Sequence, residues 1–198
     1  MTKIIGLTGG IGSGKTTIAR LFKEMKIPVY IADDEAKKVM QSSAIINAIK
    51  NAFGTTVFDD TKLIREKLAS IVFNDSEKLK TLNSIVHPAV KGDFKEWIAK
   101  QAAFPFVIYE SAILFESGSY KDFDVIITVT APLELRIERV IQRDKTSRAQ
   151  VLNRINSQWT DEDRIAKSDY HIENINLESV KNQMDNILKI LRIRQNES

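Results

Sequence analysis

Short apolar segments alternate along the chain with amphipathic stretches, and this alternation predicts strands separated by helices. Within them, 106–109 and 125–129 read as continuous apolar runs, which is typical of parallel strands that are buried on both faces. The predicted strands are 3–8, 28–31, 106–110, 124–129 and 169–172. The predicted amphipathic helices around them are 15–25, 132–142 and 177–194. The pattern therefore indicates an α/β fold built on a parallel five-stranded sheet.

The interval between the second and third predicted strands has helical periodicity and no evident strand signal. The helices predicted there are 34–40, 43–52, 61–72 and 75–99. Because a single crossover helix cannot account for such a length, we interpret 34–99 as a helical insertion. The core would then consist of 1–33, 100–142 and 166–198.

Segment 143–165 is polar, charged and helical, and it has no obvious buried face. We call it the lid segment, because a mobile helical lid has this pattern. An ordinary surface hairpin of helices has the same pattern, so the sequence leaves both interpretations open.

Composition narrows the class of protein without deciding it. The 198 residues suffice for one domain with a sizeable core, and the absence of cysteine excludes disulfides, thiolate catalysis and cysteine metal sites. The 29 basic residues are interleaved with 26 acidic ones, and no basic run typical of nucleic-acid binding dominates. No secretory signal and no apolar run of membrane-spanning length is evident. We therefore expect a cytoplasmic monomer or weak homo-oligomer that binds neither nucleic acid nor membrane.

Residues 9–16, Gly-Gly-Ile-Gly-Ser-Gly-Lys-Thr, fit the pattern G-x-x-x-x-G-K-[ST] between a predicted strand and a predicted helix. We call them the phosphate loop. The glycines let backbone N–H groups converge on phosphate oxygens, and the helix N-terminus adds partial positive charge. Lys15 is placed to reach the terminal phosphates of a nucleotide, and the Thr16 hydroxyl is placed to hold Mg²⁺. The alternative is a glycine-rich turn without chemical meaning, which would not require both the lysine and the hydroxyl.

Carboxylates follow the second and third predicted strands. Asp33 and Asp34 come directly after the second strand, and ligands gather at the carboxyl ends of strands in open parallel sheets. We assign Asp33 to the chemistry, as a base that accepts the proton of an acceptor hydroxyl, and Asp34 to the start of the next helix. Glu110 ends the third strand, where a carboxylate can lie near Mg²⁺.

Three arginines are spaced three and four apart in the helix predicted at 132–142 and just beyond it. Arg136, Arg139 and Arg143 share one helical face, while Leu133, Ile137, Val140 and Ile141 form the predicted core face. Guanidinium groups in such a row can clamp phosphates and stabilise transition-state charge. A solvated basic face paired with acidic neighbours fits the spacing equally well. We expect Arg136 to lie further from the phosphates than Arg139.

Several segments together resemble the dephospho-CoA kinase family, and the resemblance covers nearly the whole chain. Ile85-Val86-His87-Pro88 matches a His-Pro motif, and 113–118, Ile-Leu-Phe-Glu-Ser-Gly, resembles a Leu-Leu-Phe-Glu-Ser-Gly motif. The other matching parts are 4–15, 29–36, Arg139, Arg143, Asp144, Gln158 and 168–174. Four positions depart from the family pattern: Ile31 replaces an aspartate, Lys37 an arginine or histidine, Glu110 an aspartate, and Ala112 a proline.

The resemblance implies a P-loop kinase of the nucleoside-monophosphate-kinase type with a helical substrate domain and a helical lid. It implies transfer of the γ-phosphate of ATP, with Mg²⁺, to the ribose 3′-hydroxyl of dephospho-CoA. The implied catalytic residues are Lys15, Asp33 and Arg139. The implied ATP-binding residues are Gly10, Ile11, Gly12, Ser13, Gly14, Lys15, Thr16, Thr17 and Arg143, with Thr16 on the metal. Asp33, Arg65 and His87 are implied on the acceptor side.

Two other functions remain open at this point. A related kinase could phosphorylate another small acceptor, such as a nucleotide or shikimate, because acceptor choice depends on side-chain detail. A nucleoside-triphosphate switch that binds partners belongs to a different class, and the guanine-reading Asn-Lys-x-Asp segment of such switches does not occur here.

Overall fold

The computed structural model describes residues 2–72 and 75–196. Residues 1, 197 and 198 of the predicted core and residues 73–74 of the predicted insertion lie outside the described residues. The chain divides into two compact units, each of which is described by itself. The first comprises Met1–Ile31 with Gln101–Ser198, and the second comprises Ala32–Lys100.

Within the described residues, the first unit contains a five-stranded sheet in the order β2-β5-β1-β6-β7. Its strands are β1 (Lys3–Thr8), β2 (Val29–Ile31), β5 (Phe106–Glu110), β6 (Val125–Thr130) and β7 (Tyr170–Glu173). Every neighbouring pair in the sheet is parallel. The predicted parallel five-stranded sheet is therefore confirmed, with strand bounds that differ from the predicted ones by a residue at most at either end.

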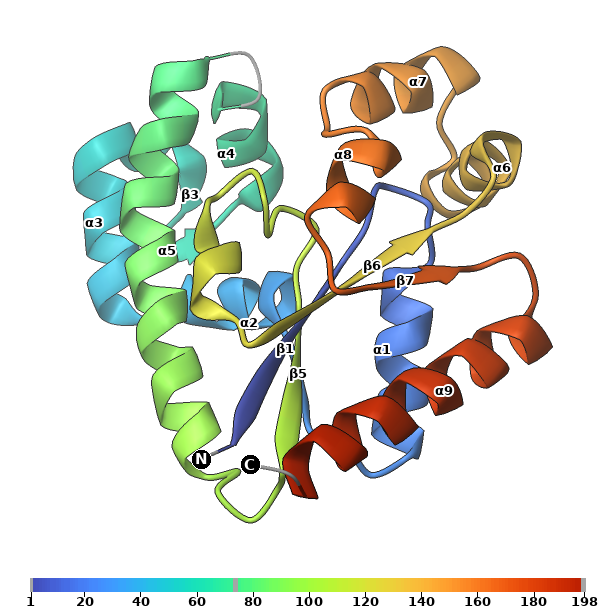
Figure 1. Ribbon diagram of the computed structural model, residues 1–198. Helices are drawn as coiled ribbons and strands as arrows, with labels where there is room; N and C mark the ends of the chain where they lie inside the picture. Colours follow the sequence, from blue (N-terminus) through green and yellow to red (C-terminus); the bar gives the residue numbers. More distant parts are fainter. Residues whose placement is uncertain (1, 73–74, 197–198) are drawn as a thin grey trace. The chain divides into compact units, whose positions relative to one another are not determined.

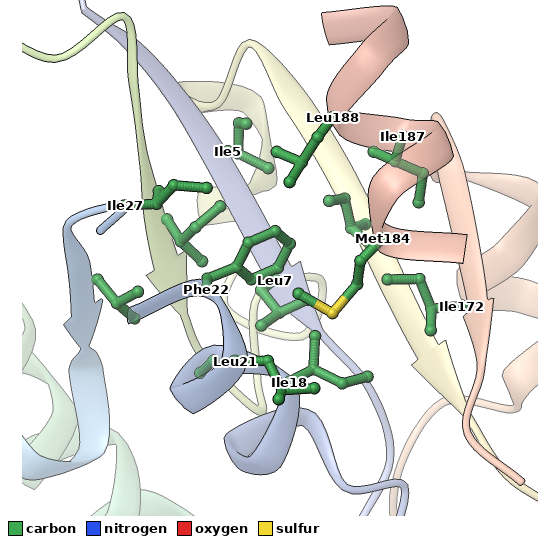
Figure 2. Packing of buried hydrophobic residues seen from close by; sticks show 14 of the residues in the cluster. Ile5, Leu7, Ile18, Leu21, Phe22, Ile27, Ile172, Met184, Ile187 and Leu188 are labelled. Atoms are coloured by element: carbon green, nitrogen blue, oxygen red, sulfur yellow. The ribbon is translucent and has the colours of Figure 1, made fainter. Parts of the chain in front are cut away.

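Helices α1 (Lys15–Glu24) and α9 (Leu177–Asn196) pack on one face of this sheet. Figure 2 shows Phe22 of α1 and Met184 of α9 meeting over Leu7 of β1, and all three side chains are completely buried. Apolar side chains of 114–126 cover the opposite face, where Leu114 and Phe115 pack with Ile126 of β6. A sheet covered on both faces explains why its strands read as continuous apolar runs.

Three helices lie beyond the carboxyl end of β6, as Figure 1 shows in yellow to orange. They are α6 (Leu133–Asp144), α7 (Arg148–Asn156) and α8 (Asp161–Ala166). Val151 of α7 is fully buried against Ile11, Ile137 and Val140, and Arg164 of α8 is fully buried as well. The expectation that the lid segment has no buried face was wrong, because one valine among charged residues is too weak a periodic signal to detect.

The second unit consists mainly of helices around its own hydrophobic core. The helices are α2 (Ala32–Val39), α3 (Ser43–Phe53), α4 (Arg65–Val72) and α5 (Ser76–Ala99), with a short 3-10 turn at Thr55–Val57. The core cluster contains Ile49, Val57, Phe58, Leu68 and Val72.

A two-stranded antiparallel hairpin in this unit corrects the predicted absence of strands in 34–99. Strands β3 (Phe58–Asp59) and β4 (Lys62–Leu63) pair with each other, so α4 begins at Arg65 and not at residue 61. Asp60 adopts a left-handed φ of 53° in the tight connection, a conformation that aspartate tolerates better than most residues. Strands of two residues are too short to produce an alternating pattern, which is why sequence periodicity missed them.

Candidate functional site

The phosphate loop connects the end of β1 at Thr8 to the start of α1 at Lys15. Gly12 and Gly14 have left-handed φ values of 78° and 87°, which residues with a side chain rarely adopt. Gly14 is the N-cap of α1, and its carbonyl accepts from the N–H groups of Thr17 and Ile18, so the first N–H groups of the helix, those of Lys15 and Thr16, are left for a ligand. These groups, together with the helix dipole, make the loop a site for phosphate oxygens.

The carbonyl groups of the loop are held by side chains from later parts of the chain. Arg136 Nε donates to the Ile11 carbonyl at 2.9 Å, and Asn174 Nδ2 donates to the Ser13 carbonyl at 2.8 Å. Arg139 Nη1 lies 3.5 Å from the carbonyls of Gly12 and Ser13, and its Nη2 donates to the Asn174 carbonyl at 3.2 Å. The loop is therefore fixed by α6 and by the residue that follows β7.

Lys15 and Glu110 meet at the carboxyl edge of the sheet. Lys15 Nζ lies 3.8 Å from Glu110 Oε1, and the two side chains are 14% and 3% exposed. The strand register accounts for this approach, because Glu110 at the end of β5 pairs with Leu7 near the end of β1. A lysine ammonium group is thus held at the phosphate loop by a buried carboxylate.

A cavity of about 640 Å³ opens beside the phosphate loop within the first unit. It is lined by the first turns of α1, by Arg139 and Arg143 of α6, and by 174–177. Ile175 and Leu177 are 51% and 54% exposed, so the cavity has an apolar wall as well as a basic one. Sequence analysis did not assign residues 174–177 to a site, because their place beside the loop arises only from the fold.

The arginines of α6 lie at successive positions along the helix axis and have different surroundings. Arg136 and Arg143 are seven residues apart, which is about 10 Å along a helix. Arg136 is 6% exposed beneath the phosphate loop, and burial lowers the pKa of its guanidinium. Arg143 lies at the exposed end of the helix and lines the cavity. The solvated-face interpretation was therefore wrong for Arg136, which is buried against the Ile11 carbonyl. Leu133 of the predicted core face is 47% exposed.

Arg143 is paired with its neighbour Asp144. Its Nε and Nη2 donate to the two carboxylate oxygens at 2.6 and 3.1 Å, and Arg154 Nη1 of α7 donates to the same carboxylate at 2.7 Å. The hydrogen bonds from Arg143 and Arg154 lower the pKa of Asp144 to about 2. The Asp144 carboxylate thus orients the guanidinium of Arg143, which is the predicted ATP-binding residue, and it also connects α6 to α7.

The predicted acceptor-side residues belong to the second unit. Helix α2 begins at Ala32, so Asp33 and Asp34 both lie exposed in its first turn, and Asp34 does not occupy the predicted N-cap position. Asp34 instead accepts a hydrogen bond from Lys37 Nζ at 2.8 Å. Sequence analysis misplaced the helix start by two residues, because Ala32 gives no capping signal.

Arg65 and His87 lie on different helices of that unit. Arg65 Nη2 donates to the Lys37 carbonyl at 3.0 Å, and Arg65 lines a cavity of about 610 Å³ formed by the two residues after α2, by α3, by the hairpin and by the start of α4. The His87 side chain is exposed on α5, and partial desolvation lowers the pKa of its imidazole.

The oxygen donors at the phosphate loop suit Mg²⁺. Thr16 is exposed in the first turn of α1, and the Glu110 carboxylate ends the neighbouring strand. Hydroxyl and carboxylate oxygens are the donors that Mg²⁺ prefers, usually together with water and substrate phosphates. Within residues 2–72 and 75–196, no group of three or more histidine, aspartate or glutamate side chains forms a metal cage. Any metal at this site would therefore take several of its ligands from the nucleotide and water.

Comparison with known proteins points to a single family. The family model described as dephospho-CoA kinase matches residues 3–179. The chain belongs to the dephospho-CoA kinase family. A dephospho-CoA kinase from Bacteroides fragilis strain YCH46 is 41% identical over 171 residues, which cover 86% of this chain and 83% of that protein.

Solved structures agree with this membership. The Thermus thermophilus protein TT1252 is similar with a TM-score of 0.88 and 32% identity over 96% of this chain and 97% of that one. Dephospho-CoA kinase from Campylobacter jejuni is similar with a TM-score of 0.71 and 27% identity over 98% of this chain and 100% of that one. The predicted fold class is thereby confirmed. Among the described helices of this family member, none combines the length and hydrophobicity that crossing a bilayer requires.

Proposed function

We propose that the protein transfers the γ-phosphate of ATP to the ribose 3′-hydroxyl of dephospho-CoA and so forms coenzyme A. The observation that carries the proposal is family membership over nearly the whole chain, together with a phosphate loop that is held in place and open to a cavity. Localisation in the cytoplasm is part of the proposal.

The nucleotide binds in the first unit. The triphosphate lies on the phosphate loop, where the N–H groups of Gly12, Gly14 and the start of α1 donate hydrogen bonds to its oxygens. Adenosine occupies the adjoining cavity, between the arginines of α6 and the apolar side chains of Ile175 and Leu177. Arg143 approaches the nucleotide from the exposed end of α6.

Lys15 and Arg139 act on the transferring phosphoryl group. Lys15 already lies at the loop, and binding of a triphosphate offers its ammonium group a stronger anionic partner than the single carboxylate of Glu110. Arg139 reaches the loop from α6 and supplies a guanidinium for the charge that spreads over the phosphoryl oxygens. Mg²⁺, held through Thr16 with Glu110 nearby, would neutralise β- and γ-phosphate charge when bound.

Asp33 accepts the proton of the attacking hydroxyl. Its carboxylate is exposed and comes two residues after Ile31, the last residue of β2. Arg65 and His87 contribute to acceptor binding in the second unit, where Arg65 lines a cavity of about 610 Å³. Closure of the lid segment excludes water, which otherwise competes as an acceptor.

An acceptor panel tests the reaction directly. The purified full-length chain is incubated with ATP and Mg²⁺ and with dephospho-CoA, shikimate or a nucleoside monophosphate, and products are followed by mass and by ³¹P NMR. We expect phosphorylation of dephospho-CoA at the 3′ position only. Faster phosphorylation of another acceptor, or ATP binding without any transfer, would contradict the proposal.

A further inference from the structure

Ile11 of the phosphate loop is held through both of its backbone groups. Its N–H donates to Gln158 Oε1 at 2.9 Å, and its carbonyl accepts from Arg136 Nε at 2.9 Å. Gln158 lies in the lid segment and Arg136 on α6. One residue of the loop therefore connects two elements that sequence analysis treated separately.

Peptide geometry gives these bonds a direction. All the described peptide bonds are trans, and in a trans peptide the carbonyl of one residue and the N–H of the next point in opposite directions. With the Ile11 carbonyl turned toward Arg136, the Gly12 N–H points away from α6. The Ser13 carbonyl is turned toward Asn174, so the Gly14 N–H points away from that residue. Each carbonyl that is held thus sets the direction of the amide donor that follows it.

Arg136 is itself fixed by a largely buried ionic network. Its Nη1 donates to Asp161 at 2.8 Å, and Asp161 lies 3.4 Å from Arg164, which is fully buried. Arg164 donates from Nη2 to Glu116 at 2.9 Å and from Nη1 to the Trp159 carbonyl at 2.6 Å. The network runs without interruption from Glu116, through the start of α8, to the phosphate loop.

The loop packs against Arg136 without spare room. A side-chain carbon added at Gly12 would lie 2.5 Å from the Arg136 carbonyl oxygen, and one added at Gly10 would collide with the Arg136 guanidinium. Movement of Arg136 therefore displaces the loop backbone, and the loop cannot shift toward α6 to compensate.

We propose that Arg136 and Gln158 are positioning residues that aim the amide groups of the phosphate loop at the nucleotide. They touch the loop backbone and not the reacting atoms, so they act through Ile11 and Gly12. The network to Glu116 couples the lid segment to phosphate affinity. This inference rests on the proposed function only in taking ATP as the bound nucleotide.

The test compares ATP with adenosine. Adenosine has no phosphates, so it binds in the cavity without hydrogen bonds from the N–H groups of the loop. If these N–H groups point in the wrong direction, the binding of ATP is therefore weakened and the binding of adenosine is not. We expect Arg136→Met to raise the Kd of ATP at least about tenfold, the scale for loss of a charge-assisted hydrogen bond, and to leave the Kd of adenosine unchanged. Both constants are measured by NMR titration of the full-length protein, well below its Tm. Arg136→Lys keeps the charge but cannot serve Ile11 and Asp161 together, so it should rescue only partly.

Matched variants separate positioning from general damage. Arg148→Met removes an arginine that forms an exposed bidentate pair with Glu134 on neighbouring helices, and it should change neither Kd. Gln158→Leu removes only the acceptor of the Ile11 N–H, and it should raise the Kd of ATP by a smaller factor. If Arg136→Met does not fold, Gln158→Leu and Arg136→Lys decide the question. An unchanged Kd of ATP in the folded variants, or equal losses for ATP and adenosine, would overturn the inference.

These measurements need no acceptor, so the two proposals can fail separately. A wild-type protein that binds ATP but does not phosphorylate dephospho-CoA contradicts the proposed function and leaves the positioning test in force. A wild-type protein that binds no ATP contradicts both.

Discussion

The two units of the chain use charged side chains in opposite ways. Around the phosphate loop, charges are paired and buried, as in Arg136 with Asp161 and Arg164 with Glu116, whose side chains are between 0% and 23% exposed. In the second unit, the pairs Lys37–Asp34 and Lys80–Glu77 are more than half exposed and lie three residues apart on a helix. Breaking a buried pair is strongly destabilising, whereas an exposed pair contributes under about 1 kcal/mol.

This difference predicts how each unit responds to substitution of its charged residues. The nucleotide side depends on a preset polar network, so its substitutions should alter both ATP binding and stability. The second unit is held by the apolar cluster around Ile49 and Leu68, so its charged surface can change without loss of the fold. Substitutions on that surface should alter acceptor kinetics alone.

Loss of Lys15 should have the largest effect. We expect Lys15→Ala to abolish phosphoryl transfer and to lower Tm modestly, because Glu110, which is 2% exposed, loses the nearby cation. Adding Glu110→Gln in the same chain should restore Tm without restoring transfer. The control Lys23→Ala removes an exposed lysine from the last turn of the same helix and should behave as wild type. Near-normal turnover of Lys15→Ala would contradict the assignment of the loop.

Asp33→Asn tests the second unit, where the charged side chains are exposed. Its kcat should fall about 100-fold or more, the usual scale for loss of a general base, while ATP affinity and Tm hold. Tm should hold because the carboxylate is exposed. Asp34→Asn is the matched control one residue along the same helical turn. If kcat survives in Asp33→Asn and falls in Asp34→Asn, the base has been assigned to the wrong aspartate.

Arg139→Ala should have an intermediate effect on catalysis. A guanidinium directed at the transferring group matters most in the transition state, so kcat should fall more than KM for ATP rises. Arg139→Lys keeps the charge without the planar fork, so its rescue should be partial. Arg154→Ala is the control, since that arginine forms an exposed pair with Asp144. Arg136 cannot serve as a control, because it contacts the loop itself. If Arg139→Ala is as active as the wild type, Arg139 has only a structural role.

The smallest expected effect concerns Asp144 and pH. Its folded pKa of about 2 lies below the ordinary value of 3.8, so its contribution to stability is complete above about pH 4 and is lost as pH falls toward 2. The pair is close to solvent, so Asp144→Asn should cost under about 1 kcal/mol at pH 7. Urea unfolding should show nearly the same difference in unfolding free energy from wild type at pH 7 and pH 4, and a smaller difference at pH 3. If the difference in unfolding free energy grows as the pH falls, the predicted direction of the pH dependence is wrong.

The sequence predicted the parts of this molecule that depend on local pattern. Largely apolar runs located the strands of the sheet, because burial on both faces leaves few polar positions. The spacing of glycines, Lys15 and Thr16 located the phosphate loop, because that motif acts through backbone geometry within eight residues. The approach of Lys15 to Glu110 was not predicted, because it depends on β1 and β5 being neighbours in the sheet.

Features that depend on distant contacts were not predictable in this way. The burial of Arg136 is decided by Asp161 and the loop backbone, and spacing along α6 contains neither. Gln158 and Asn174 were recognised as family positions without a role, because an isolated amide side chain gives no sign of which backbone group it meets. The β3–β4 hairpin depends on packing of Phe58 into the second core and not on its own length.

The bond from Asn174 to Ser13 spans 161 positions of the sequence. During synthesis, the phosphate loop leaves the ribosome early, long before the residues that orient it exist. Arg136, Gln158 and Asn174 are added one after another, and Asn174 is the last of the three. A nascent chain that ends before them therefore carries a complete glycine motif whose carbonyl groups are not yet held. Nucleotide affinity should rise stepwise as each of these residues is added and folds back onto the loop.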